Sequence, residues 1–316
     1  MKILFTCVGR RVELVQSFRL ASERLGVALD IYATDACDSA PATYFCDRTF
    51  IAPPIRAEGY IPFLLALCEK EKIDALIPTI DTDLLILSKN KQAFASVGTR
   101  VFVANPDKVA LCRDKRLTSD YFTSLGLYAP KAVADINDYD GGFPAFIKPK
   151  DGSSSINAYK ANTLDELKGY AERIGEYVVQ PFADGVEYTV DIFCDIEGNP
   201  VYITPRIRLA VRAGEVLKTQ IRQEASIISE MKTLIADFKP SGAITVQLIR
   251  NEQTGRNAYI EINPRFGGGA PLSIKAGADA SEAMLRILQG ERITYVEGAA
   301  EDGATYSRFD QSVRVH

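Results

Sequence analysis

The sequence predicts an α/β fold followed by an α+β fold, on three observations. Short apolar runs alternate with stretches of helical periodicity over about the first hundred residues, and this rhythm then breaks. From residue 187 the chain continues as short strands joined by tight turns. Alternating strands and helices favour a mostly parallel sheet, and successive strands favour an antiparallel one. We therefore expect three parts, at residues 1–105, 106–178 and 179–316.

In the first part, strands and helices are expected in turn. The strands are expected at residues 2–7, 28–34, 75–78 and 101–104, and the helices at residues 11–25, 60–71 and 83–91. In the first helix, Val12, Val15 and Phe18 recur at helical spacing, and Gly26 is a typical stop. The loops at the carboxyl ends of parallel strands contact ligands, and here these loops are residues 6–11, 34–38 and 79–83.

The later parts mix helices with shorter strands. A helix from residue 106 is expected to carry Asp114 and Lys115 and to end near Gly126. Strands are expected at residues 144–148 and 177–180, with a helix at residues 163–174 between them. Turns at residues 195–199 and 251–256 indicate antiparallel hairpins in the last part.

Composition narrows the function classes. Of the 316 residues 47% are apolar and 25% charged, and the formal net charge is −4. This balance disfavours broad binding to nucleic acid or to a membrane surface, because such binding needs a basic face. No apolar run approaches the roughly 20 residues of a transmembrane helix, and Arg10 and Arg11 follow the first apolar run too early for a signal peptide. We expect a cytoplasmic protein that acts on small molecules.

Histidine and cysteine usage excludes further chemistry. The only histidine is His316, the last residue, which excludes a histidine-based triad, a histidine-ligated zinc and an imidazole relay in the interior. The six cysteines form no Cys-x-x-Cys pair, so reduced thiols are expected. The chemistry is therefore expected from carboxylates, amides, lysines, arginines and the backbone.

The segment 242–269 contains the most informative pattern. Alternation along its second strand places Glu261 and Asn263 on one face and points Ile260 and Ile262 into the core. A hairpin through the turn at residues 251–256 sets Gln247 directly opposite Glu261.

One carboxylate and two amides suit Mg²⁺ that arrives on a polyphosphate, since this ion takes few protein oxygens. A solvated hairpin face is the alternative. Arg265 and the three glycines after it favour the metal site, because a solvated face needs neither a cation nor a backbone without side chains.

A strand delivers Lys148 to a serine-rich loop at residues 151–157, which includes Ser153, Ser154 and Ser155. Small residues let backbone N–H groups approach phosphate oxygens, and serine hydroxyls add donors. The loop is not a Walker A motif, because no Gly-Lys-Ser/Thr follows. A surface turn is the alternative interpretation.

Residues 178–191 predict a strand, a hinge and a second strand. The hinge follows Gln180, Pro181 and Phe182, and Glu187 lies just beyond it. Exposed hinge backbone can pair with the edge of an adenine, and a carboxylate there can accept both ribose hydroxyls. An ordinary strand connection is the alternative.

Five cations lie within seventeen residues, and only Glu215 opposes them in that stretch. Such a patch in an acidic protein indicates an anionic ligand, a carboxylate or a phosphoryl group. A solvated basic face is the alternative. The five are Arg206, Arg208, Arg212, Lys218 and Arg222.

Taken in order, these features resemble the ATP-grasp superfamily, specifically its carbamoyl-phosphate-synthase-like branch. The motifs that carry the resemblance are Gly9-Arg10-Arg11, Asp81-Thr82-Asp83, Asp114-Lys115, Phe146-Ile147-Lys148-Pro149, the loop 151–157, Gln180-Pro181-Phe182, Gly185-Val186-Glu187 and Glu261-Ile262-Asn263-Pro264-Arg265. The resemblance implies a pre-ATP-grasp domain at residues 1–105 and a two-part ATP-grasp domain, with its small subdomain at residues 106–178 and its C-terminal subdomain at residues 179–316.

The resemblance also implies roles for individual residues. Lys115 and Lys148 would contact ATP phosphates, and the loop with Ser153, Ser154 and Ser155 would close over them. Gln180, Pro181 and Phe182 would bind adenine, and Glu187 the ribose. Gln247, Glu261 and Asn263 would hold two Mg²⁺ ions, or Mn²⁺. Arg265 would face the phosphoryl group in transfer, and Arg206 and Arg208 the acid substrate.

The implied activity is ATP-driven activation of a carboxylate to an acyl phosphate, followed by capture with an amine. Phosphoryl transfer relies on positioning and charge neutralisation, which suits a chain without internal histidine. The chain holds one ATP-grasp unit and no glutaminase, so we expect a stand-alone ligase, in a possible homodimer, that takes its amine from solution. One alternative is a carbamoyl-phosphate-synthase-like component that forms carboxyphosphate or phosphorylates carbamate. Another is a catalytically weak ATP-binding sensor, which the glycine-poor loop favours. A dehydrogenase is disfavoured, because Cys7–Arg11 lacks the Gly-x-Gly-x-x-Gly pattern.

Overall fold

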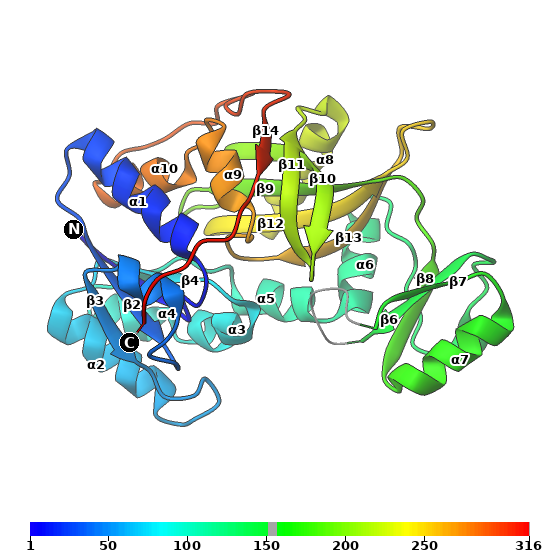
Figure 1. Ribbon diagram of the computed structural model, residues 1–316, viewed down its shortest axis with the longest axis horizontal. Coiled ribbons are helices and arrows are strands. Elements are labelled where there is room, and N and C mark those ends of the chain that lie inside the picture. Colours follow the sequence, from blue (N-terminus) through cyan, green and yellow to red (C-terminus); the bar gives the residue numbers. More distant parts are fainter. Residues whose placement is uncertain (151–156, 316) are drawn as a thin grey trace.

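The computed structural model describes residues 1–150 and 157–315, and their strands form three sheets (Figure 1). A five-stranded parallel sheet of order β3-β2-β1-β4-β5 forms the N-terminal part. Its strands are β1 (Lys2–Thr6), β2 (Asp30–Asp35), β3 (Arg48–Ile51), β4 (Ala75–Pro78) and β5 (Arg100–Val101). The helices between them are α1 (Val12–Leu25), α2 (Tyr60–Glu71), α3 (Asp81–Lys89) and α4 (Lys91–Ser96).

Side-chain alternation buries both faces of this sheet. Ile3 and Phe5 of β1 belong to the hydrophobic cluster that contains Phe18 of α1, whereas Leu4 belongs to the cluster that contains Tyr60 of α2. All five side chains are fully buried. A parallel sheet covered on both faces is stable only as part of such a layered core.

A small three-stranded sheet of order β7-β6-β8 lies on the opposite side of the molecule (Figure 1). It consists of β6 (Ala145–Pro149), β7 (Tyr159–Ala161) and β8 (Tyr177–Pro181), and helix α7 (Leu164–Ile174) packs on it. The predicted serines Ser153, Ser154 and Ser155 lie outside the described residues.

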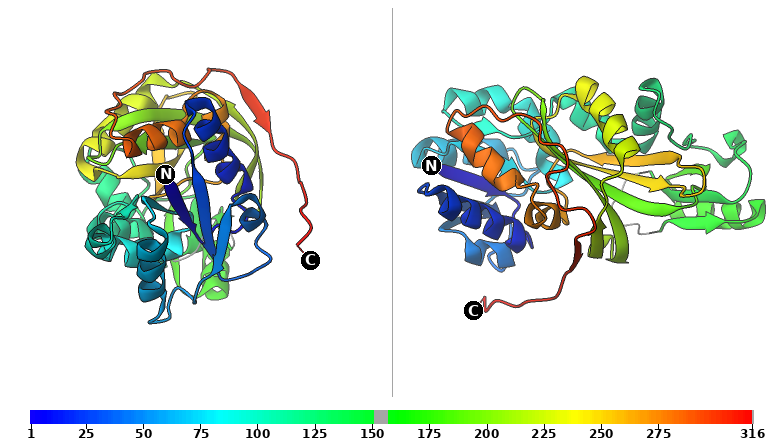
Figure 2. Two further views of the ribbon diagram at one scale, coloured as in Figure 1. Left: turned by 90° about the vertical axis from the view of Figure 1, so that its left-hand side faces the viewer. Right: turned by 90° about the horizontal axis from the view of Figure 1, so that it is seen from above.

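A six-stranded antiparallel sheet of order β13-β12-β9-β10-β11-β14 lies between these two parts. Its strands are β9 (Val186–Cys194), β10 (Pro200–Arg212), β11 (Glu215–Ile221), β12 (Gly242–Arg250), β13 (Asn257–Asn263) and β14 (Thr305–Ser307). After β14 the chain runs on to the C-terminus beside the N-terminal part (Figure 2). There the Tyr44 hydroxyl donates a hydrogen bond to the Val315 carbonyl at 2.8 Å.

The predicted fold class, a parallel α/β sheet followed by antiparallel sheets, is confirmed. The boundaries at residues 105 and 178 stay predictions. The single helix expected from residue 106 to residue 125 is wrong, because it is two helices, α5 (Pro106–Arg113) and α6 (Lys115–Ser124). Asp114 lies between them in an extended conformation and accepts a hydrogen bond from the Arg116 backbone N–H at 2.9 Å. Aspartate favours this N-cap position over a helix interior.

The prediction of only strands and turns in the last part of the chain is wrong, because three helices also lie there. These are α8 (Ala225–Phe238), α9 (Ala270–Lys275) and α10 (Ala280–Leu288). The apolar residues of α8 recur at helical spacing in the sequence, so its signal was present. No helix among the described residues has both the length and the apolar character needed to cross a bilayer.

Candidate active site

One face of the six-stranded sheet carries two rows of polar and charged side chains. The predicted pairing of Gln247 with Glu261 is confirmed, and it extends across four strands. The first row is Arg206, Thr189, Gln247 and Glu261, and the second is Thr204, Asp191, Thr245 and Asn263. Because side chains alternate along each strand, both rows face the same side.

A β-bulge follows the paired Gln247 and Glu261. Leu248 pairs with Tyr259, which leaves Ile260 as the extra residue of β13. The expectation that Ile260 points into the core is therefore wrong, because Ile260 lies beside Glu261 in the wall of a cavity. Tyr259 takes the core position instead.

The glycines after Arg265 cross the polar face of the sheet. A Cβ atom at Gly267 would lie 2.8 Å from Thr245 Oγ1, and one at Gly269 would lie 2.5 Å from Arg206 Nη2. Glycine is therefore required here by a close approach of the backbone to the side chains beneath it. The segment covers the sheet from β12 to β10.

Two cavities adjoin this polar face, with volumes of about 250 and 650 Å³. We call the smaller one the first cavity and the larger one the second cavity. They share wall residues from four elements, so one molecule can reach both. The shared residues are Lys115, Arg208, Gly214, Gln247 and Glu261.

The first cavity contains most of the predicted nucleotide-binding residues. Phe146 and Phe182 lie 6.3 Å apart between ring centroids and supply aromatic surface for a purine. Gln180 and Glu187 also line the cavity. Pro181 lines neither cavity, because it alternates with Gln180 and Phe182 and its ring packs near Gly141. A direct role for Pro181 in adenine binding thus lacks support from the geometry.

Lys148 is buried at the floor of the first cavity, with 7% of its surface exposed. Burial lowers its pKa to about 8, although Glu261 raises this value and the charge of Lys115 lowers it further. Lys115 begins α6, and its Nζ donates to the Lys150 carbonyl at 3.3 Å. Both lysines therefore line the first cavity.

We expect nucleotide affinity to fall above about pH 8. Below its pKa, Lys148 carries the charge that attracts a phosphate. Above that pKa, binding requires proton uptake, so affinity decreases by up to about tenfold per pH unit. Calorimetric titration with MgADP between about pH 7 and pH 9.5 measures this slope. Lys148→Arg keeps its positive charge over this pH range and should make the MgADP affinity nearly independent of pH. A wild-type affinity that does not change with pH would contradict the role of Lys148 in phosphate binding.

The three predicted metal ligands lie together in the second cavity. Asn263 Nδ2 donates to Glu261 Oε1 at 2.9 Å, and Gln247 is paired with Glu261. No three His, Cys, Asp or Glu side chains within the described ranges gather as a metal site. A cation held here would complete its shell with amide oxygens and phosphate oxygens, which fits Mg²⁺ bound to a nucleotide.

The second cavity is strongly cationic. Among the described residues that line it, seven are basic and three acidic, in a chain whose net charge is −4. A concave wall of one charge sign concentrates ligands of the opposite sign. The basic residues are Arg11, Arg56, Arg113, Lys115, Arg206, Arg208 and Arg265, and the acidic ones are Asp81, Glu215 and Glu261.

The five-cation patch predicted from the sequence does not form one surface. Arg206 and Arg208 line the second cavity, but Arg212, Lys218 and Arg222 line neither cavity. Arg206 and Arg208 also lie close to carboxylates of β9, which are outside the sequence stretch 206–222 in which the five cations were counted. Arg208 Nε lies 3.1 Å from Glu187 Oε1.

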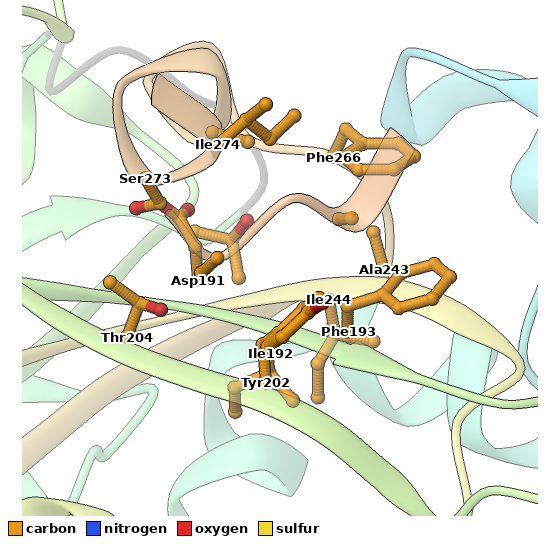
Figure 3. A pocket seen from close by; sticks show the side chains of 14 residues that line it. Asp191, Ile192, Phe193, Tyr202, Thr204, Ala243, Ile244, Phe266, Ser273 and Ile274 are labelled. Carbon is orange, nitrogen blue, oxygen red and sulfur yellow. The ribbon is translucent and has the colours of Figure 1, made fainter. Parts of the chain in front are cut away.

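Arg206 is 1% exposed and is held by Asp191. Asp191 Oδ2 accepts hydrogen bonds from Arg206 Nε and from the Ser273 hydroxyl, both at 2.7 Å. Arg206 Nη1 is buried and has no hydrogen-bond partner among the described residues. Asp191 and Ser273 also line a small, mostly apolar pocket beneath α9 (Figure 3). Its volume of about 20 Å³ has room for about one water. That pocket is too small for a substrate.

Arg265 joins the sheet to the N-terminal part. Its Nη2 donates to Asp81 Oδ2 at 2.6 Å and to Asn263 Oδ1 at 3.3 Å. Asp81 begins α3, which is anchored by the fully buried Asp83 two residues on. Asp83 Oδ2 accepts a hydrogen bond from Thr6 Oγ1 at 2.7 Å, and burial raises the Asp83 pKa to about 6.

Sequence reasoning assigned no site role to Arg11, Arg56, Arg113 or Asp81, although all four line the second cavity. Arg11 and Asp81 lie in or beside loops expected to contact ligands, at the carboxyl ends of β1 and β4. That signal was available. Nothing local in the sequence indicates that Arg56 and Arg113 face the same space.

Two family models match the chain. Residues 3–102 match the model described as PylC-like, N-terminal domain, and residues 173–311 match the one described as ATP-grasp in the biosynthetic pathway with Ter operon. The carbamoyl phosphate synthase large chain of Campylobacter jejuni is 25% identical over 288 residues, which cover 78% of this chain and 25% of that one. The chain thus spans about a quarter of the length of this curated relative.

Solved structures share the fold across nearly the whole chain. The biotin carboxylase domain of Hydrogenobacter thermophilus 2-oxoglutarate carboxylase, in complex with MgADP, ADP and bicarbonate, has a TM-score of 0.75 at 15% identity. The match covers 96% of this chain and 73% of that one. The L-amino acid ligase of Bacillus licheniformis has a TM-score of 0.73 at 17% identity, covering 96% and 78% of the two chains. Residues 173–311 of the chain thus match an ATP-grasp family model, and most of the chain is similar in sequence to about a quarter of the carbamoyl phosphate synthase large chain.

Proposed function

We propose that the chain is an ATP- and Mg²⁺-dependent ligase that activates a small carboxylate and joins it to an amine. One observation carries the proposal. An aromatic nucleotide-sized cavity and a larger cationic cavity share the wall that contains Gln247 and Glu261. A phosphoryl group leaving the nucleotide at this wall enters a space suited to an anionic acceptor.

In the proposed reaction, a carboxylate oxygen attacks the γ-phosphorus of ATP, and ADP leaves with the electron pair of the broken P–O bond. The amine then attacks the acyl carbon, phosphate leaves, and the amine loses a proton. Phe146, Phe182 and Gln180 would bind the base, and Glu187 the ribose.

Lys148 and Lys115 would neutralise phosphate oxygens. Gln247, Glu261 and Asn263 would hold the divalent cations, two by the family pattern, and these ions would supply charge neutralisation at the polyphosphate. Arg265 would stabilise charge on the transferring group, because its guanidinium is already oriented by Asp81. Arg208 would orient the acid.

Arg206 would contribute its charge from beneath the glycine segment. Direct contact between Arg206 and a substrate requires Gly269 to move, because that backbone lies against the guanidinium. The similarity in fold to an L-amino acid ligase supports a carboxylate–amine reaction for this site.

Release of ADP and phosphate, measured against a panel of carboxylates with and without ammonium or amino acids, tests the proposal. We expect ADP release that depends on one acid, and a ligated product by mass spectrometry that also depends on an amine. Tight ATP binding without turnover across the panel would contradict it and indicate a nucleotide sensor.

A further inference from the structure

The N-terminal wall of the second cavity carries three arginines that the nucleotide site does not use. Arg11 precedes α1, Arg56 follows β3 and Arg113 ends α5. The first two lie beyond the carboxyl ends of parallel strands, where ligands of such sheets bind. They line the same cavity as the predicted metal ligands.

Two of these arginines have no counter-ion in the part of the chain that the structure describes. Among the described residues, no carboxylate lies within ion-pair distance of Arg56 or Arg113, and both side chains are exposed. Arg11 is half-buried. Burial lowers the pKa of Arg11, Glu215 opposes this effect, and the nearby charge of Arg265 adds to it. Arg11 is therefore close enough to Arg265 for the two charges to interact.

The carboxylate of Glu215 shows which chemical group the cluster accepts. Glu215 Oε1 lies 3.3 Å from Arg11 Nη1, and the same carboxylate lies against Gly268, where no Cβ atom would fit. A Cβ atom at Gly268 would also lie 2.7 Å from Arg11 Nη1. An internal carboxylate thus lies between a guanidinium and the glycine backbone.

We propose that Arg11, Arg56 and the backbone at Gly268 form a subsite for a second anionic group, a carboxylate or a phosphate, of the acid substrate. This subsite rests on the proposed ligase function and deepens it, because the substrate is then an acid with at least two negative groups. One group reacts beside Arg265, and the other replaces Glu215 at Arg11.

Displacing the Glu215 carboxylate from Arg11 by a substrate anion costs little free energy. Its side chain is 51% exposed, and an ion pair of such exposure contributes little. Glu215 Oε2 also lies 3.6 Å from Arg308 Nη1, so the carboxylate keeps a counter-ion after it leaves Arg11. Arg113 adds positive charge for a ligand that arrives with more than one anionic group.

Matched acids test the subsite in the ADP-release assay with the full chain, Mg²⁺ and ATP. The pairs are glutamate against glutamine and 3-phosphoglycerate against glycerate, since the members of each differ in the second anion. We expect the doubly anionic member of one pair to have a KM at least about tenfold lower. A lower KM in the glutamate pair would show that the subsite binds a carboxylate, and a lower KM in the phosphoglycerate pair would show that it binds a phosphate.

Arg11→Met should raise that KM by about a hundredfold and leave the KM of the partner acid unchanged. Arg10→Met is the matched control, because Arg10 is exposed and lines neither cavity. Glu215→Gln should lower the KM of the doubly anionic acid severalfold, because a competing carboxylate is removed. A raised KM for the amine in Glu215→Gln would instead assign Glu215 to the amine and overturn the proposal.

Calorimetric titration of the same acids into the MgADP-bound chain separates the two proposals. Arg11-dependent binding without ADP release would retain the subsite and refute the ligase. Equal affinity for both members of each pair, in wild type and in Arg11→Met, would overturn the subsite even where ADP release is observed. Absence of binding by all four acids would overturn it too.

Discussion

Glu261→Gln is expected to lower kcat/KM by about a thousandfold or more, since a divalent ion contributes several kcal/mol of charge stabilisation in the transition state. The substitution keeps the shape and the hydrogen-bonding capacity of the side chain but removes the one carboxylate of the predicted metal site. ADP release as a function of Mg²⁺ concentration measures the effect. Thermal unfolding should stay within a few degrees of wild type, because Glu261 lies in a cavity wall rather than in the core.

Glu252→Gln is the matched control for this variant. Glu252 lies in the turn of the same hairpin, its side chain is 52% exposed, and it lines neither cavity. Its substitution should leave turnover unchanged. Glu261→Gln with near wild-type turnover and an unchanged Mg²⁺ dependence would show that the metal assignment is wrong.

Arg265→Ala is expected to lower kcat by about a hundredfold or more, because a fixed guanidinium that faces developing charge is lost. The affinity for MgADP should change little, since Arg265 lines only the second cavity. Single-turnover kinetics and MgADP titration measure the two quantities separately.

A structural role for Arg265 makes a different prediction. Arg265 could serve only to attach the sheet to α3 through Asp81, in which case Asp81→Asn would reproduce the loss seen in Arg265→Ala. We expect Asp81→Asn to lose clearly less kcat than Arg265→Ala, because the cation remains. Equal losses in the two variants would refute a catalytic role. Arg212→Ala removes an exposed ion pair with Asp310 and is the control for general charge loss.

The predictions that succeeded from sequence rest on local geometry. Alternation placed Glu261 and Asn263 on one face, and the length of a hairpin set Gln247 opposite Glu261. The same rule separates Pro181 from Gln180 and Phe182, so its exclusion from the first cavity was already implied by the strand. The helical spacing of α8 was also present in the sequence, although this helix was missed.

The errors have identifiable physical causes. Ile260 leaves the core because of a bulge, and Tyr259 takes the buried position, where it stacks on Phe122 of α6 at 5.0 Å between centroids. A bulge of this kind depends on packing against a helix more than a hundred residues earlier in the chain. The helix expected from residue 106 is interrupted at Asp114 because capping the second helix satisfies backbone groups that would otherwise lack partners.

By itself the sequence determined the order of the motifs, the two sheet types and the polar face of the central hairpin, because side-chain direction along a strand repeats every two residues. Only the tertiary structure decided that Arg265 meets Asp81, 184 residues away, and that Arg11 meets Glu215. Only the tertiary structure also showed that Arg206 and Arg208 line the second cavity, whereas the other three cations of that stretch line neither cavity. Contacts at such separations depend on how whole sheets pack, and no local period encodes that packing.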